Sequence, residues 1–402
     1  MKPKLLVVTS TFPRWSNDTD PPFVYELSRR LTDSFDVTVH TPHYPGSKTN
    51  EQIGGMHIHR FRYFFAPYER LAGGRGIVPK MRRNKLYSLL LPFFLFSQFF
   101  SLILLVAKLH PDLIHAHWLI PQGFWAVVAK KLFKIPVIIT AHGADVFSLR
   151  TPAVIRIKQW IVKNADRIVT VSLALAEVLR NDTQSPLQPY IIPMGVDASL
   201  FSPEKKSRSI RGQYGINGLF LLFVGRLTEK KGVRYLIDAM SMVIKDFPNA
   251  KLLIIGHGEL EQDLLEQVKL RDLEDIVLFA GGIANAQLPS YYATADLFIG
   301  PSVQVKFGDS EGFGLTFVEA AMSSCLVIGT TVGGIEDIIK DGVTGYLVPP
   351  GDSNALAAKI VEVLADLNNH ENMKAEARNE ATVKFDWSLI AARYRDAYLS
   401  YL

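Results

Sequence analysis

The sequence predicts an α/β protein made of two doubly wound domains, each built on a parallel sheet. Three observations support this. The 402 residues suit two domains better than one core. Short apolar runs alternate with segments of helical periodicity, which is typical of βαβ units. The alternation pauses once, in a stretch rich in Pro, Gly, Ser and charge at residues 193–209, and then restarts.

The first domain is predicted to cover residues 1–200. Its expected strands are apolar runs bounded by polar or turn residues, at 5–8, 37–40, 113–115, 137–140 and 168–171. The segments between them show apolar residues at helical spacing, which predicts helices at 23–32, 86–107, 123–133 and 173–180.

The second domain is predicted to cover residues 201–384. Its strands are expected at 219–224, 252–255, 277–279, 297–299, 326–329 and 346–348. The closing segment, 385–402, spaces aromatic and apolar residues helically and is predicted to complete the first domain. In such a fold the domains face each other across a cleft, and ligands bind there, at the carboxyl ends of the strands.

The charge is distributed unevenly between the two halves. The chain carries a net +5, but residues 1–200 hold 24 basic and 13 acidic side chains, and residues 201–402 hold 20 and 26. A single cysteine, Cys325, excludes a disulfide framework and is interpreted as a buried thiol. The basic residues form no stripe along a helix, so we expect no nucleic-acid partner.

Residues 86–107 carry no charge and are long enough to cross a bilayer. Pro92 and Gln98 interrupt them, which favours a helix packed on the sheet or lying on a membrane. The preceding residues, 60–85, hold eight basic side chains, one acidic side chain and several aromatics. An anionic membrane surface and a solvated loop beside a core helix both fit this composition. We expect a cytoplasmic protein, peripheral on the cytoplasmic membrane in the first case, because the N-terminus shows no secretory signal.

Two carboxylates lie eight residues apart at Glu311 and Glu319, with Gly312 and Gly314 between them. Glycines let backbone N–H groups approach a ligand, and a helix beginning near Gly314 directs its positive end at the same place. Carboxylates suit hydroxyl-rich ligands. In isolation the two residues would be ordinary surface glutamates.

Four further loops follow predicted strands of the second domain. Arg226 and Lys231 follow the strand at 219–224 and provide a fork and a point charge suited to a diphosphate. Glycine turns follow three more strands, at residues 256–258, 281–282 and 333–334. Together these loops predict a nucleotide site, although no single one would.

The combined motifs resemble family 4 of the retaining, nucleotide-sugar-dependent glycosyltransferases, which have the GT-B architecture of two Rossmann-like domains. The resemblance covers nearly the whole chain. It rests on the residues 112–118, 140–145, 223–226 with 231–232, 255–258, 310–319, 333–336, 346–351 and 385–387.

The resemblance implies roles for residues of the second domain. Arg226 and Lys231 would bind the donor diphosphate and stabilise the leaving group, and Glu311 would hold hydroxyls of the transferred sugar. Glu319 would bind the ribose. Backbone groups would complete the donor site, near the sugar at Gly312, Phe313, Gly314 and Leu315, and near the base at Gly282 and Ile283.

In the first domain, His142 follows a strand beside Gly143, where packing requires no imidazole, and the resemblance places the matching histidine near the reacting sugar. His117 and Asp145 are candidate acceptor contacts, and Asp145 is equally a candidate helix cap. The family's usual glycines are missing after the first strand, where Arg14 is expected to substitute.

The predicted reaction is transfer of a sugar from a nucleotide-diphosphate sugar to an acceptor hydroxyl, in polysaccharide or glycolipid synthesis, with a carbohydrate or lipid-linked acceptor. No cofactor or metal is expected, because no His/Cys cluster has metal-ligand spacing and the acidic turn at Asp18 lies early in the chain. A nucleotide-sugar epimerase and a non-catalytic sugar-nucleotide-binding subunit remain alternatives.

Overall fold

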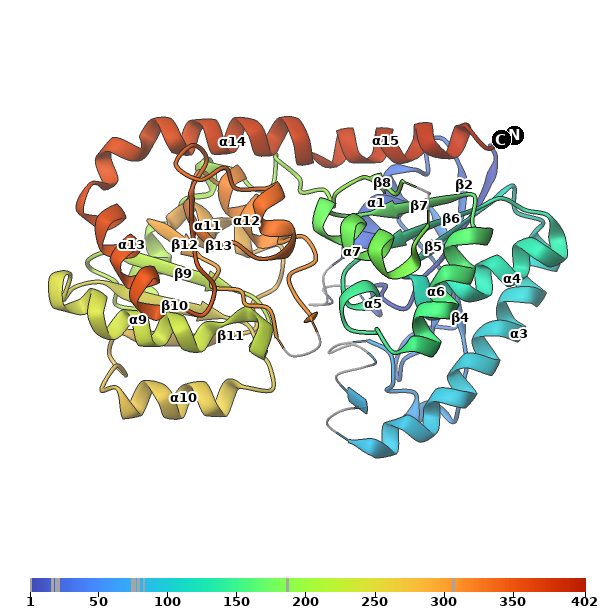
Figure 1. Ribbon diagram of the computed structural model, residues 1–402, viewed down its shortest axis with the longest axis horizontal. Coiled ribbons are helices and arrows are strands. Elements are labelled where there is room, and N and C mark those ends of the chain that lie inside the picture. Colours follow the sequence, from blue (N-terminus) through green and yellow to red (C-terminus); the bar gives the residue numbers. More distant parts are fainter. Residues whose placement is uncertain are drawn as a thin grey trace. The chain divides into compact units, whose positions relative to one another are not determined.

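The protein divides into two compact units (Figure 1). The computed structural model describes residues 2–15, 18, 22–73, 77, 80–81, 84–185, 188–305 and 308–402. Unit 1 comprises residues 1–193 and 390–402, and unit 2 comprises residues 194–389. The sequence predicts the corresponding boundaries at 200 and 385, so the polar stretch after residue 193 is part of unit 2. There, Gly195 lies against the ring of Trp387.

Unit 1 contains an eight-stranded sheet in the order β3-β4-β2-β1-β5-β6-β7-β8. All neighbours pair in parallel except β3 and β4. The strands are β1 (Lys4–Val8), β2 (Asp36–Pro42), β3 (Asn50–Ile53), β4 (Met56–Phe61), β5 (Leu113–His117), β6 (Val137–Ala141), β7 (Arg167–Thr170) and β8 (Tyr190–Ile191).

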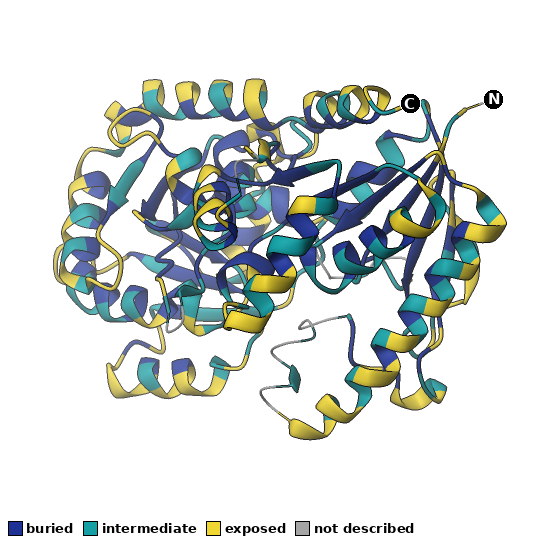
Figure 2. Ribbon diagram, turned by 45° about the vertical axis from the view of Figure 1, so that its right-hand side comes forward, coloured by how far each residue is buried: buried dark blue, intermediate teal, exposed yellow. Residues whose placement is uncertain are grey.

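Helices surround this sheet, and its central strands are buried (Figure 2). They are α1 (Phe23–Arg30), α3 (Leu91–Leu109), α4 (Phe124–Phe133), α5 (Ala144–Phe147), α6 (Pro152–Asn164), α7 (Leu173–Thr183) and α15 (Trp387–Leu399). The chain returns to unit 1 at Ile390, within α15. The hydroxyl of Tyr394 lies 3.1 Å from Oγ1 of Thr140, which attaches the closing helix to β6 of unit 1.

Unit 2 contains a six-stranded parallel sheet in the order β11-β10-β9-β12-β13-β14. This is the dinucleotide-fold order, in which the chain reverses direction across the sheet between β9 and β12. The strands are β9 (Phe220–Val224), β10 (Lys251–Ile255), β11 (Val277–Gly281), β12 (Leu297–Ile299), β13 (Leu326–Thr330) and β14 (Tyr346–Val348). All six predicted strands are confirmed.

Two groups of helices pack with the sheet of unit 2. One contains α9 (Val233–Asp246), α10 (Glu261–Leu270) and α13 (Ser353–Ala365). The other contains α8 (Arg208–Gln213), α11 (Leu288–Thr294), α12 (Leu315–Met322) and α14 (Glu371–Phe385). A continuous apolar core lies between the sheet and the first group, because strands buried on both faces need a helical cover on each side.

The structure differs from the prediction in several places in unit 1, where α5, α6 and β8 are additional to the predicted elements. Residues 50–61 form a hairpin at the sheet edge, through the turn Gly54-Gly55, whose φ angles are +57° and +79°. The predicted helix at 86–107 is divided into a 3₁₀ segment (Lys85–Leu90) and α3, which begins beside Pro92. Proline is accepted in a first helical turn because its missing N–H would have no helical partner there.

Candidate functional site

The predicted diphosphate residues of unit 2, Arg226 and Lys231, lie in the loop at the carboxyl end of β9. Arg226 lies two residues after β9, and Ser302 lies three residues after β12. These two strands are neighbours at the point where the strand order reverses, which is where doubly wound sheets bind their ligands.

Gly232 fixes the loop that carries Lys231. Its φ angle is +64°, and a Cβ at this position would lie 1.9 Å from the carbonyl oxygen of Pro301, so any other residue would collide with that backbone. The N–H of Val303 also donates to the carbonyl of Lys230 at 2.8 Å. These contacts hold the β9 loop against the β12 loop.

A charged cluster joins Lys231, Glu311 and Ser302. The Lys231 ammonium forms an ion pair with Oε2 of Glu311, and the Ser302 hydroxyl donates to the same oxygen at 3.4 Å. Burial alone would raise the pKa of Glu311, but the ammonium groups of Lys231 and Lys230 outweigh it and lower this pKa to about 2. The Arg226 guanidinium acts in the same direction. Glu311 is therefore a carboxylate at every physiological pH.

Glu319 has a different environment. It lies on α12, and its Oε2 accepts a hydrogen bond from the Tyr292 hydroxyl at 2.8 Å. Burial raises the pKa of Glu319 to about 7, although Tyr292 and the Lys231 ammonium act to lower it. Lys231 thus acts on both predicted carboxylates, which places the donor-sugar and ribose candidates around one cation.

The glycine-rich loop leads into α12 as predicted. The residues Gly312, Phe313 and Gly314 precede the helix, which begins at Leu315, and Gly314 has a φ angle of +103°. The N–H of Gly334 donates to the Glu311 carbonyl at 3.1 Å. The backbone that positions Glu311 is therefore held by the next glycine turn.

The predicted base-binding loop, at Gly282 and Ile283, follows β11. The Gly282 N–H donates to Nε2 of His257 at 2.8 Å, and Nδ1 of His257 lies 3.1 Å from Glu261. His257 thus orders this loop. Binding of a base by Gly282 and Ile283 stays a prediction.

In unit 1, His117 and His142 form a neutral pair. Nδ1 of His117 lies 2.9 Å from Nε2 of His142, at the ends of the neighbouring strands β5 and β6. Burial lowers the pKa of His142 to about 3 and that of His117 well below its ordinary value. His117 is 0% exposed, whereas His142 is partly exposed to solvent. The His142 ring contacts the rings of Phe23 and Trp118.

Asp145 organises the loop around His142. Its carboxylate accepts hydrogen bonds from the backbone N–H groups of Leu119, His142 and Gly143, at 2.9, 3.2 and 3.0 Å. Its side chain is buried, and burial raises its pKa. Asp145 therefore positions His142, and its contact with an acceptor stays a prediction.

Arg14 lies in the loop after β1 and is held by Asp18 and two aromatic rings. Its backbone N–H and Nε donate to Oδ2 of Asp18, at 2.9 and 2.8 Å. Its guanidinium lies 4.7 Å from the Trp15 ring and 4.8 Å from the Tyr44 ring. Of the acidic turn expected here, Asp18 is described, and residues 19–20 lie outside the described residues.

All ten donor candidates belong to unit 2, whereas His142, His117, Asp145 and Arg14 belong to unit 1. Sequence reasoning missed Ser302, Tyr292 and Lys230. Ser302 lies three residues after a predicted strand, so the rule that identified Arg226 could have found it. Within the described ranges, no three His, Cys, Asp or Glu side chains are placed to hold a metal ion. Metal independence stays a prediction.

Both halves of the chain match models of known protein families. The family model for glycosyl transferases group 1 matches residues 207–380, and the model for Glycosyltransferase Family 4 matches residues 22–200. An uncharacterized glycosyltransferase of Methanocaldococcus jannaschii is 32% identical, over 71% of this chain and 75% of its own. A phosphatidyl-myo-inositol mannosyltransferase of Mycobacterium leprae is 30% identical, over 71% and 73%.

Among solved structures, HepE of Anabaena in complex with UDP has a TM-score of 0.75 at 20% identity, covering 99% of this chain and 100% of that one. The fold is therefore GT-B, and the protein is an enzyme of the hexosyltransferase type. The chain belongs to the glycosyltransferases of group 1, with a Family 4 first domain.

Proposed function

We propose that this enzyme transfers a sugar, with retained anomeric configuration, from a nucleotide-diphosphate sugar to a hydroxyl of a carbohydrate or lipid-linked acceptor. The observation that carries the proposal is the cluster of Lys231, Glu311 and Ser302, with Arg226 beside it, at the switch point of unit 2. A diphosphate needs cations beside it, and Lys231 and Arg226 supply them although residues 201–402 are acidic overall.

In the proposed step, the bond between the anomeric carbon and the diphosphate oxygen breaks while the acceptor oxygen bonds to the same carbon. The acceptor proton passes to the departing diphosphate. Lys231 and Arg226 stabilise the charge that develops on the leaving group, and Glu311 accepts hydrogen bonds from hydroxyls of the sugar. The reaction needs no metal, because these cations neutralise the phosphates.

His142 takes a role suited to a neutral imidazole. With a pKa of about 3, His142 stays uncharged during turnover. Its neutral ring can therefore donate a hydrogen bond to a sugar hydroxyl or accept one from it. His117 fixes its ring orientation through the 2.9 Å bond. Arg14, held between Trp15 and Tyr44, offers a cationic and aromatic surface to the acceptor.

The cellular role we propose is glycolipid or polysaccharide synthesis. The mannosyltransferase relative, named for phosphatidyl-myo-inositol, supports a lipid-linked acceptor. Relatives named glycogen synthase support a carbohydrate acceptor.

The test measures nucleotide-diphosphate release from UDP-, GDP- and ADP-sugars, with and without extracted lipid and oligosaccharide acceptors. Sugar transfer predicts release that requires an acceptor, and a product whose anomeric configuration matches the donor. A new sugar nucleotide formed without acceptor would show an epimerase instead. Donor binding with no turnover under any acceptor would favour a non-catalytic subunit.

A further inference from the structure

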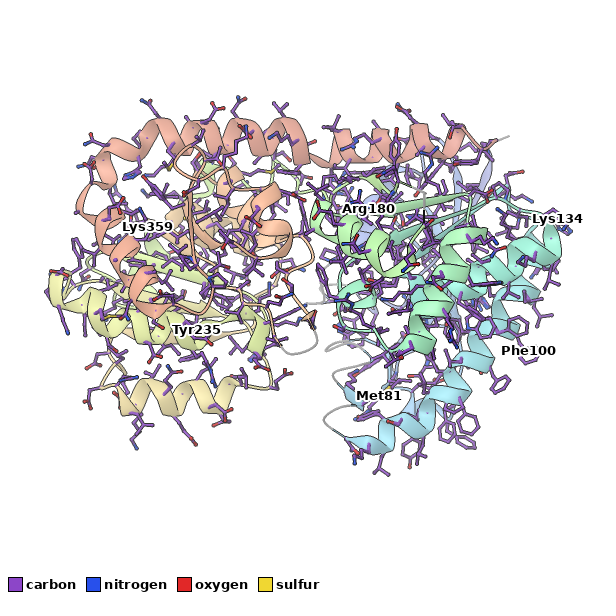
Figure 3. The ribbon with its side chains drawn as sticks, in the orientation of Figure 1. Met81, Phe100, Lys134, Arg180, Tyr235 and Lys359 are labelled. Atoms are coloured by element: carbon purple, nitrogen blue, oxygen red, sulfur yellow. The ribbon has the colours of Figure 1, made fainter. Side chains whose placement is uncertain are left out.

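The helix α3 and the 3₁₀ segment before it present an apolar face that the described chain leaves uncovered. Together they have a mean hydropathy of 2.4 over 18 residues. Six large apolar side chains are between 52% and 69% exposed: Leu86, Leu89, Phe93, Phe96, Phe100 and Leu104. Phe100 points away from the body of its domain (Figure 3).

The exposed residues of α3 form one continuous stripe. At about 100° per residue, Phe93, Phe96, Phe100 and Leu104 fall within an arc of about 80°. The buried residues of the helix occupy the opposite side: Phe94, Gln98, Leu102 and Val106. The helix therefore has two apolar faces, one against its own domain and one towards solvent.

The inner face is firmly attached to unit 1. Phe94 packs edge-on against Phe61 and Tyr63, with ring centroids 5.3 and 5.2 Å apart. Oγ of Ser101 lies 3.1 Å from Nε2 of His40 and 3.2 Å from Nε2 of His59. Both histidines belong to the sheet, so these contacts favour a helix lying on its domain over one that crosses a bilayer alone.

The surrounding charge identifies the chemistry of the partner. Residues 70–111 contain seven Lys or Arg and no Asp or Glu. Lys85 and Lys108 are exposed at the two ends of the stripe. The aromatic side chains of Phe65 and Tyr68 are also exposed. Cations bordering an apolar helical face match the headgroups and acyl chains of an anionic bilayer.

A second copy of the chain fits this surface less well. A symmetric dimer would place the same stripe, with its cations, against itself and bring like charges together. A bilayer offers acyl chains to the phenylalanines and phosphates to the lysines at once.

We propose that this face inserts into the boundary between headgroups and acyl chains of an anionic membrane. Phe93, Phe96 and Phe100 then lie below the lipid phosphates, and Lys85 and Lys108 lie level with them. The inference goes beyond the sugar transfer proposed above and does not depend on it. It makes the protein peripheral on the membrane rather than spanning it.

The test is sedimentation of the full chain with vesicles of phosphatidylcholine alone, or of phosphatidylcholine with phosphatidylglycerol. We expect binding to the anionic vesicles that weakens as salt is raised. The variant F93S/F96S/F100S should lower the partition coefficient at least about tenfold. The matched control L265S/L270S/V383S removes three exposed apolar side chains of unit 2 and should bind like the wild type.

A second variant, K85E/K108E, changes charge without touching the apolar stripe and should weaken binding to anionic vesicles several-fold. Equal partition of F93S/F96S/F100S and wild type would overturn the proposal, as would a wild type that ignores anionic vesicles. A wild-type dimer in sedimentation velocity that this triple variant abolishes would assign the face to a second copy instead. Nucleotide titration of the same variants separates these outcomes from failure of the donor site.

Discussion

The candidate site of unit 2 is built from charged side chains, whereas the histidine pair at the candidate site of unit 1 is neutral. In unit 2, Glu311 is ion-paired with Lys231, and the neighbouring cations lower the pKa of Glu311. In unit 1, burial keeps His117 and His142 neutral. Yet residues 201–402 are acidic overall and residues 1–200 are strongly basic. The comparison teaches that a site's charge is set by the few residues around it and not by the net charge of its domain.

Removing the cation of unit 2 should have the largest effect. K231A takes away the charge expected to face the diphosphate and leaves Glu311 largely buried without this partner. We expect kcat/KM to fall by about 10²–10³-fold. The exposed Lys245, replaced in K245A, is the matched control. Similar kinetics in K231A and K245A would show that the site of unit 2 does not depend on the Lys231 charge.

Removing the imidazole of unit 1 should have a smaller effect, of constant size across pH. We expect H142A to lower kcat/KM by about 10–10²-fold. Because the His142 pKa is about 3, the ratio of wild-type to variant rates should not change between pH 5 and 8. A ratio that changes around pH 6.5 would mean that the His142 imidazole titrates there, and the inference that this site is neutral would be wrong.

The two glutamates should give opposite slopes of stability against pH. The native pKa of Glu319 is raised to about 7, so the native state holds its proton more tightly than the unfolded chain does. Its contribution to the unfolding free energy should fall by about 2 kcal/mol as pH rises from 4.5 to 7. Urea unfolding of E319Q should lack this loss. Parallel profiles of unfolding free energy against pH in wild type and E319Q would contradict this prediction.

Glu311 acts at lower pH. Its native pKa is depressed to about 2, so its stabilising contribution is complete above pH 4.5 and is lost as the pH falls towards 2. E311Q should therefore flatten the acid limb of the stability curve, measured by the same urea unfolding. The exposed Glu274, as E274Q, serves as control and should leave that limb unchanged.

The smallest effect is expected on removing the hydroxyl of Tyr398, which contacts the ring of His115. The hydroxyl of Tyr398, on α15, lies 2.6 Å from Nδ1 of His115, and both residues are buried. Y398F should lower the unfolding free energy of unit 1 by about 1–2 kcal/mol, because a buried ring nitrogen loses its partner. Y190F, at an exposed tyrosine, is the control. Equal melting temperatures would show that this bond adds nothing.

The sequence predicted the sheets well because buried parallel strands are continuous apolar runs. It missed β3, whose residues Asn50–Ile53 are mostly polar, since an edge strand exposes one side and lacks that signal. Arg226 and Lys231 were predicted because they follow such a strand, whereas Glu311 and Glu319 were predicted from the glycines between them and the helix that follows. The partnership of Tyr292 with Glu319 was not, since it joins α11 to α12 and no local pattern encodes that contact.

The central claim is that Lys231, with Arg226, forms a diphosphate site beside the sugar-binding carboxylate of Glu311. Calorimetric titration of UDP, GDP and ADP into wild type, K231A and K245A tests it most directly. We predict that at least one nucleotide binds wild type and K245A alike, and binds K231A at least about tenfold more weakly. Equal affinity for wild type and K231A, or no binding of any of the three, would contradict the account.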